Sequence, residues 1–98
     1  MRALILAAFV AAAPAMAVPV ARNGSDVVRL LETPCVESVA KLIRPEARER
    51  YRLARVNIGS QEWAACWSLR PDGLVVLVYE DGDGGLIPAN QFKDEPGV

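Results

Sequence analysis

The chain has 98 residues, with 11 lysines and arginines against 12 aspartates and glutamates, and it has no histidine. A formal net charge of −1 does not favour a nucleic-acid partner, and the lack of histidine excludes the commonest general base and the usual zinc ligand. We therefore expect a protein that is not an enzyme, that uses no cofactor and that does not bind nucleic acid.

The N-terminal segment, residues 1–17, has the pattern of a secretory signal peptide. Arg2 supplies the positive charge, residues 3–13 form an apolar run, and Ala15-Met16-Ala17 is a small-x-small cleavage pattern. The run is shorter than the roughly 20 apolar residues that span a bilayer. We predict cleavage after Ala17, a periplasmic or secreted product, and no stable membrane anchor.

The remaining chain is predicted to be one small domain, residues 26–93, between a flexible leader at 18–25 and a flexible tail at 94–98. A domain of this size has a core of marginal stability. In an oxidising compartment, an even cysteine count in so short a chain is typical of a structural disulfide. We expect Cys35 and Cys66 to form that bond.

Two helices are expected after a short strand at residues 27–31. Thr33 is a suitable N-cap, and Pro34 suits the first helical position. Apolar residues then recur at helical spacing as far as Ile43, until Arg44-Pro45 interrupts the pattern. A second, shorter helix follows to Tyr51. Together these features predict a bent helix pair.

Three strands are expected next, over residues 53–58, 62–69 and 74–80. The turn Arg70-Pro71-Asp72-Gly73 has the residues of a type I turn followed by a left-handed glycine. Such a turn pairs Leu69 with Val75, and the pairing then continues residue by residue to Ala65 and Tyr79. The predicted fold class is therefore α+β: a bent N-terminal helix pair packed on a three- or four-stranded antiparallel meander with one disulfide.

The predicted hairpin has two apolar faces of different bulk. The aromatic face holds Trp63, Ala65, Trp67, Leu69, Val75, Leu77 and Tyr79, and the small-residue face holds Ala64, Cys66, Ser68, Leu74, Val76 and Val78. The Cα atoms of a disulfide lie within about 7 Å, so the helix that carries Cys35 should cover the small-residue face.

The aromatic face then needs its own cover, and the sequence leaves three alternatives open. The sheet could curl, the N-terminal strand or residues 86–92 could fold over it, or a partner, including a second copy of the chain, could bind there. An exposed patch of this kind is typical of interfaces. The candidate partner surface consists of Trp63, Trp67, Leu69, Leu77 and Tyr79.

The turn at residues 59–61 bears on the same question. A two-residue Gly59-Ser60 loop would place Val56 and Ile58 on the aromatic face, and a three-residue loop would place them on the other. The sequence does not decide between these registers.

The acidic turn at residues 80–85 is the one candidate for a metal site. Asp81 and Asp83 have the spacing of the first and third ligands of a calcium-binding loop, but Leu86 stands where such a loop needs glycine and Phe92 where it needs glutamate. Aspartate and glycine are also ordinary turn formers. A weak divalent-cation site is therefore the alternative function.

The chain also resembles a loosely defined group of small exported proteins of proteobacteria and their prophages. The resemblance rests on Thr33-Pro34-Cys35, Ala65-Cys66-Trp67, Asp72-Gly73, Glu80-Asp81-Gly82-Asp83, Ile87-Pro88 and Phe92. It implies export, a disulfide and one common fold, and it carries no functional residues because the group has no established activity. The leading hypothesis is a non-catalytic interaction module, such as an inhibitor or exclusion factor, acting on an unidentified envelope protein.

Overall fold

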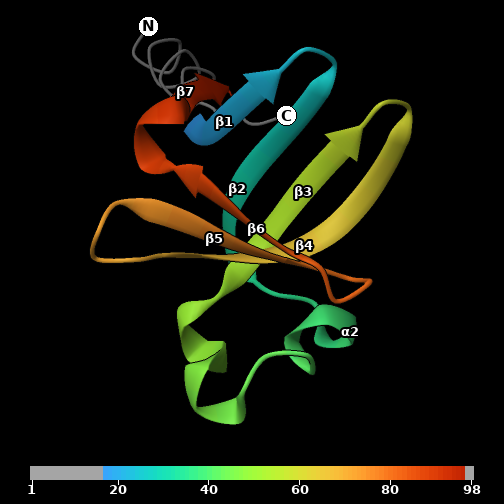
Figure 1. The fold of residues 1–98 in the computed structure, drawn as a ribbon, viewed down its shortest axis with the longest axis vertical. Helices are drawn as coiled ribbons and strands as arrows, with labels where there is room; N and C mark the ends of the chain where they lie inside the picture. The colour runs from blue at the N-terminus through green and yellow to red at the C-terminus, as the bar shows by residue number, and fades with distance from the viewer. Residues whose placement is uncertain (1–16, 97–98) are drawn as a thin grey trace, which may run out of the picture.

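The computed structural model describes residues 17–96, which form one seven-stranded antiparallel sheet with short helical segments (Figure 1). The strand order across the sheet is β6-β5-β4-β3-β2-β1-β7. The strands are β1 (Ala17–Asn23), β2 (Asp26–Pro34), β3 (Arg52–Ile58), β4 (Gln61–Leu69), β5 (Leu74–Tyr79), β6 (Gly84–Pro88) and β7 (Lys93–Pro96). The helical segments are α2 (Glu37–Ala40) and the 3-10 helices η1 (Pro45–Arg50) and η2 (Ala89–Gln91).

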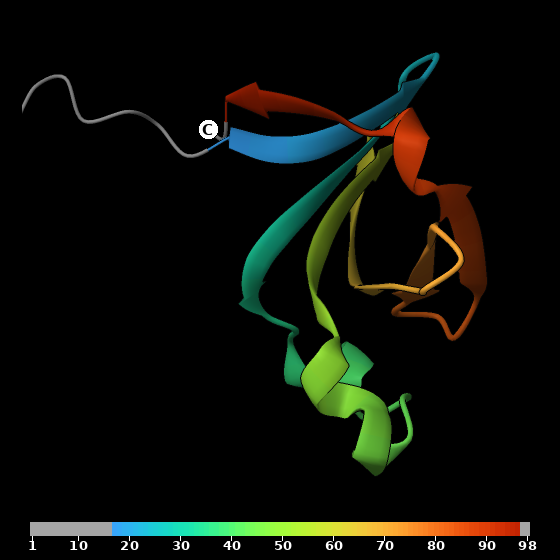
Figure 2. The same cartoon turned by 90° about the vertical axis from the view of Figure 1, so that its left-hand side faces the viewer.

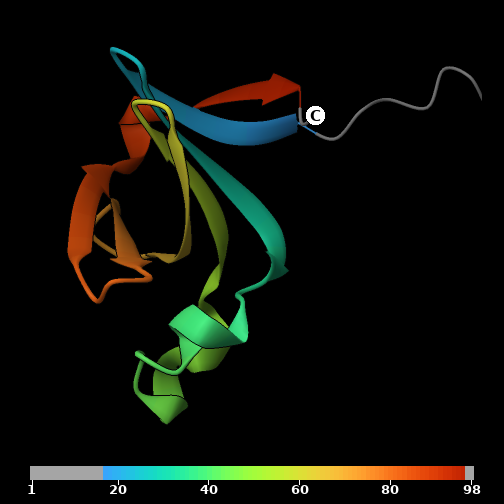
Figure 3. The same ribbon diagram turned by 90° about the vertical axis from the view of Figure 1, so that its right-hand side faces the viewer.

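The sheet is strongly curled, because its two edge strands follow each other in the chain. Strands β6 and β7 lie at opposite ends of the strand order, yet only residues 89–92 connect them. Four residues reach at most about 14 Å, so the sheet must bend until one short link joins its edges (Figures 2 and 3). The backbone N–H of Ala89 donates to the carbonyl of Gly73 at 2.8 Å and fastens the link to the β4–β5 turn.

The predicted register of the β4–β5 hairpin is confirmed. Leu69 pairs with Val75, and the pairing continues in step to Ala65 and Tyr79. Gly73 has a φ of +88°, and its N–H donates to the carbonyl of Arg70 at 3.0 Å, as a type I turn with a left-handed glycine requires.

The β3–β4 turn adopts the two-residue alternative. Ile58 pairs with Gln61 and Val56 with Trp63, so Gly59 and Ser60 alone form the loop. Gly59 has a φ of +62°, which suits the first central position of a type II′ turn. Val56 and Ile58 consequently lie on the aromatic face.

The curl turns the aromatic face inward, which is the first of the three covers considered for it. Leu77 is 0% exposed and Val56 is 1% exposed. The main core consists of Ala21, Val28, Leu30, Ala54, Val56, Ala65, Val75 and Leu77, with Trp63, Trp67, Tyr79, Ile87, Ala89 and Phe92 packed against it. The core therefore lies between opposite parts of one curled sheet rather than between a sheet and a helix.

The segments α2 and η1 cover one part of the small-residue face, around Ala64, Cys66 and Val78. Cys66 is buried in a second cluster with Val39 and Ile43, and it forms the expected disulfide with Cys35 across a Cα–Cα distance of 5.5 Å. In Figure 1 these helical segments lie below the sheet, away from the β1–β2 and β3–β4 turns.

The predicted helix pair, however, is wrong. Strand β2 continues to Pro34, which pairs with Arg52 of β3, so Thr33 and Pro34 do not start a helix. Helix α2 has only four residues and no side-chain N-cap, and residues 45–50 form a 3-10 helix. So short a helical segment is unstable in isolation. Here packing, the disulfide and a hydrogen bond from Arg48 Nε to the Ile43 carbonyl at 2.8 Å hold it.

The segments expected to be a leader, residues 18–25, and a tail, residues 94–98, both contain strand residues. Strand β1 lies between β2 and β7, with Val20 paired to Arg29 on one side and to Lys93 on the other. The β1–β2 pairing ends at Val20, next to Pro19, which has no N–H to donate. Of the predicted signal peptide, only Ala17 falls within the described residues.

The disulfide should supply a large part of the domain's stability. The bond closes a loop of sequence separation 31, for which the chain-entropy relation gives about 3 to 4 kcal/mol. The variant Cys35→Ala/Cys66→Ala should lose about that much unfolding free energy in urea titrations. Reduction should lower the unfolding free energy of the wild type by a similar amount, whereas it should not change that of the variant. Equal stabilities of oxidised and reduced wild type would contradict this prediction.

Candidate binding site

The inside of the curled sheet opens into a hollow of about 420 Å³ beside the β1–β2 and β3–β4 turns. We call it the mouth hollow; it is lined by Ala21, Arg22, Asn23, Asp26, Val28, Val56, Ile58, Tyr79, Ile87 and Gln91. Its volume falls in the range of ligand sites in proteins, which are typically mostly apolar with a few polar groups. The mouths of curled sheets and barrels are common places for such sites.

A second, smaller hollow of about 210 Å³ adjoins the first. We call it the side hollow; it is lined by Ile58, Trp63, Tyr79, Asp81, Asp83 and Gly84. Ile58 and Tyr79 belong to both hollows. Ile58 is 46% exposed, although it carries a large apolar side chain. The two hollows thus share Ile58 and Tyr79, and together they make one candidate site.

Local sequence accounts for the two residues that the hollows share. The two-residue turn after Ile58 directs this side chain to the inner face and leaves it at the end of β3, where the core no longer covers it. Tyr79 ends β5 on the same face, and its ring lies over Gly85, where a Cβ atom would be at van der Waals distance, 3.6 Å, from Cε2 of the ring.

The five residues of the predicted partner surface do not stay together. Leu77 is fully buried in the core, and Leu69, 57% exposed, lies at the far end of β4 from Trp63. Trp67 and Leu77 pair across β4 and β5 and belong to the core, whereas Trp63 and Tyr79 line the side hollow.

Trp67 has a structural role in the fold. Its Nε1 donates to the backbone carbonyl of Leu31 at 2.8 Å. The β2–β3 register shifts between Leu30 and Pro34, so the ladder is interrupted there and the Leu31 carbonyl accepts from the indole instead. Trp67 thereby fastens β4 to an irregular part of β2.

Sequence reasoning missed several residues of the site, among them Ile58, Asp26 and Gln91. The signal for Ile58 was the Gly59-Ser60 turn, whose register was undecided. Asp26 and Gln91 belong to segments that were expected to lie outside the sheet or at its end. Their place at the mouth depends on the curl, which brings β1, β2 and η2 next to β5.

Carboxylates surround the two hollows. Asp26 lines the mouth hollow, and its Oδ1 accepts from the N–H of Gly59 at 3.2 Å. Asp81 and Asp83 line the side hollow. Burial raises the pKa of the Tyr79 phenol above its ordinary 10.0, and the negative charges of Asp26 and Asp81 raise this pKa further. The two carboxylates therefore act on Tyr79 from both hollows.

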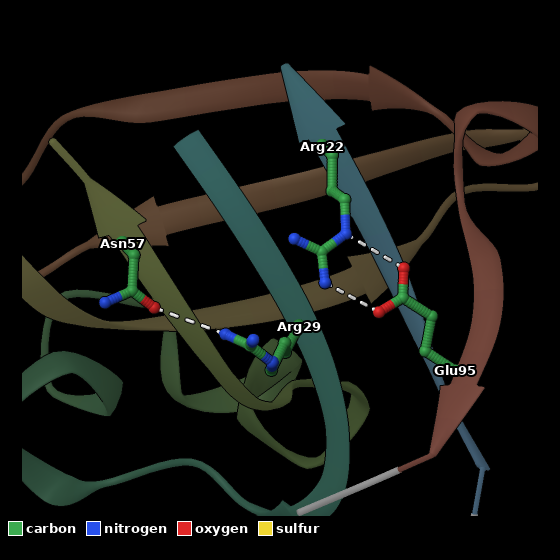
Figure 4. A network of polar contacts seen from close by, with 4 residues as sticks. All are labelled: Arg22, Arg29, Asn57 and Glu95. Carbon is green, nitrogen blue, oxygen red and sulfur yellow. Dashed lines mark hydrogen bonds and ion pairs between the residues drawn. The ribbon is translucent and has the colours of Figure 1, made fainter. Parts of the chain in front are cut away.

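The arginine that lines the mouth hollow is already paired. Nε and Nη2 of Arg22 donate to the two carboxylate oxygens of Glu95 at 3.0 and 2.7 Å (Figure 4). These hydrogen bonds lower the pKa of Glu95 and raise that of Arg22. Arg29, beside them, donates to Oδ1 of Asn57 at 3.3 Å. The pair joins β1 to β7 and neutralises the charge of Arg22.

The acidic turn is closed by its own aspartate. Oδ1 of Asp81 accepts from the N–H of Asp83 at 2.9 Å, and Gly82 has a φ of +93°. Within residues 17–96, no group of three or more histidine, cysteine, aspartate or glutamate side chains could hold a metal ion. Asp81 is thus an ordinary turn-forming residue here.

Comparison of the chain with family profiles, curated proteins and solved structures gave no match. The resemblance to small exported proteins of proteobacteria therefore stays a prediction. Across residues 17–96, no helix has both the length and the apolar character needed to cross a membrane.

Tyr79 should ionise at higher pH than an ordinary tyrosine. Because its pKa is raised in the folded chain, the unfolded chain loses this proton first. Folding stability should therefore be unaffected by this group below about pH 10 and should fall as pH rises through the folded pKa. Titration of tyrosinate absorbance in the wild type and in Tyr79→Phe tests this. The Tyr79→Phe variant should lack the ionisation phase at the higher pH. If that phase persists in the variant, it belongs to another group.

Proposed function

We propose that the protein is a non-catalytic interaction module of the periplasm or the cell exterior that binds a partner at the mouth and side hollows. Such a module would act on an envelope protein as an inhibitor or an exclusion factor. The observation that carries the proposal is the pair of hollows that share Ile58 and Tyr79 at the open end of the curled sheet. There Ile58, Trp63 and Tyr79 gather although none of them is fully buried.

Export is supported by the signal-like N-terminus and by the disulfide. A bond between Cys35 and Cys66 forms and persists in oxidising compartments. Cleavage after Ala17 would leave Val18 as the first residue, and Val18 pairs with Glu95 in the sheet. The predicted cut therefore retains the β1–β7 pairing almost completely.

A non-catalytic role is supported by the chemistry of the side chains. The sequence has no histidine, and both of its cysteines are joined in the disulfide. This removes the commonest general base and the thiol nucleophile. Tryptophan and tyrosine, present here as Trp63 and Tyr79, are instead enriched in binding hot spots.

The binding site can be tested by photocrosslinking in cells that export the protein. A benzophenone amino acid at Ile58, which is 46% exposed, should give a discrete adduct with an envelope protein. Leu69 and Leu86, 57% and 56% exposed, line neither hollow and are matched control positions. The same label there should give no such adduct. Equal labelling at all three positions, or none at Ile58, would refute the proposed site.

A further inference from the structure

The hollows combine aromatic and apolar surface with negative charge. Tyr79 lies in both hollows and Trp63 in the side hollow, so each presents part of its ring there. Val56 and Ile58 add aliphatic surface to the mouth hollow. Aromatic faces attract cations through their quadrupole, and aliphatic surface accepts the stem of a long charged side chain.

The charge balance at the hollows favours a cation. The charged residues lining them are Arg22, Asp26, Asp81 and Asp83. Arg22 is neutralised by Glu95, which lines neither hollow. An incoming group therefore meets three carboxylates and no unpaired cation among the lining residues. The position of Asp26 and Asp81 on either side of Tyr79 places this charge next to the aromatic ring.

Resting on the proposed function, we propose that the mouth and side hollows take a basic side chain, arginine or lysine, of the protein partner. The head group would lie over Tyr79 or Trp63 near the carboxylates, and its aliphatic stem would pack on Ile58. A metal ion fits this site less well. Calcium needs six to eight oxygen ligands, and one oxygen of Asp81 already closes the turn.

The two tryptophans provide an internal control for the test. In nitrogen-15 spectra of the oxidised mature chain, the indole N–H groups of Trp63 and Trp67 should give separate signals, which Trp63→Phe assigns. The probe is a blocked Gly-Arg-Gly peptide, compared with Gly-citrulline-Gly, which has nearly the same shape without the charge. The arginine peptide should shift the Trp63 signal saturably and leave that of Trp67, whose N–H is held by Leu31. The citrulline peptide should bind roughly tenfold more weakly or not at all.

The carboxylates are tested by substitutions that keep the turns. Asn at position 81 retains an oxygen to accept from the Asp83 N–H, so Asp81→Asn should remove the charge alone. The Asp81→Asn variant should bind the arginine peptide roughly two- to fivefold more weakly than the wild type. Asp72→Asn is the matched control, because it changes the net charge equally at the opposite end of β5, where Asp72 pairs with Arg70. This variant should bind like the wild type.

Three outcomes would overturn the inference. Equal binding of the arginine and citrulline peptides would show that charge is not recognised. Equal loss of binding in Asp81→Asn and Asp72→Asn would show that only net charge matters. Saturation of the Trp63 shift by calcium chloride, with no response to the arginine peptide, would assign the hollows to a metal ion. Failure of the proposed function itself shows separately, as missing adducts at Ile58.

Discussion

The β4–β5 hairpin is apolar on both faces, and the rest of the structure depends on this constraint. Leu77 and Ala65 need cover on one side, and Cys66 and Val78 need it on the other. The fold therefore uses one curled sheet for the inner face and a small helical cap for the outer face. The disulfide joins Cys35, which precedes the helical cap, to Cys66 on the outer face that the cap covers.

The same curl accounts for the binding site. A sheet that bends until a four-residue link joins its edges encloses the middle of each strand and leaves the strand ends open. Inward-facing side chains at the strand ends are then only partly covered, as Ile58 and Tyr79 are. The hollows thus arise at the strand ends, where apolar residues still face inward but the core no longer covers them. The nearby turns supply the carboxylates.

The sequence was most informative where a short-range rule had one solution. Pro71 and Gly73 define one turn, and that turn defines the register of the whole hairpin. Two cysteines allow one disulfide. The helix pair failed because the same residues, Thr33 and Pro34, suit both the start of a helix and the end of a strand, and pairing of Pro34 with Arg52 decided in favour of the strand.

Strands β1 and β6 could not be predicted for a different reason. Strand β1 contains Pro19, and β6 begins with two glycines, so their local sequences favour turns. Strand β6 is held by pairing with β5, and β1 is held in part by β7, a partner far away in the chain, as in the pairing of Val18 with Glu95. Of the candidate site, Trp63 and Tyr79 were therefore accessible to sequence reasoning, whereas Asp26 and Gln91 depend on long-range topology.

The curl also gives two tryptophans on one face of β4 different surroundings. Trp63 and Trp67 are four residues apart on β4 and point to the same side, but they serve different ends. Trp67 lies towards the cap, where the irregular β2 offers it the Leu31 carbonyl. Trp63 lies towards the mouth, across from Val56 and beside the side hollow. The aromatic face is consequently core over most of its length and candidate binding surface at one end, because the sheet closes over the first part and opens at the second.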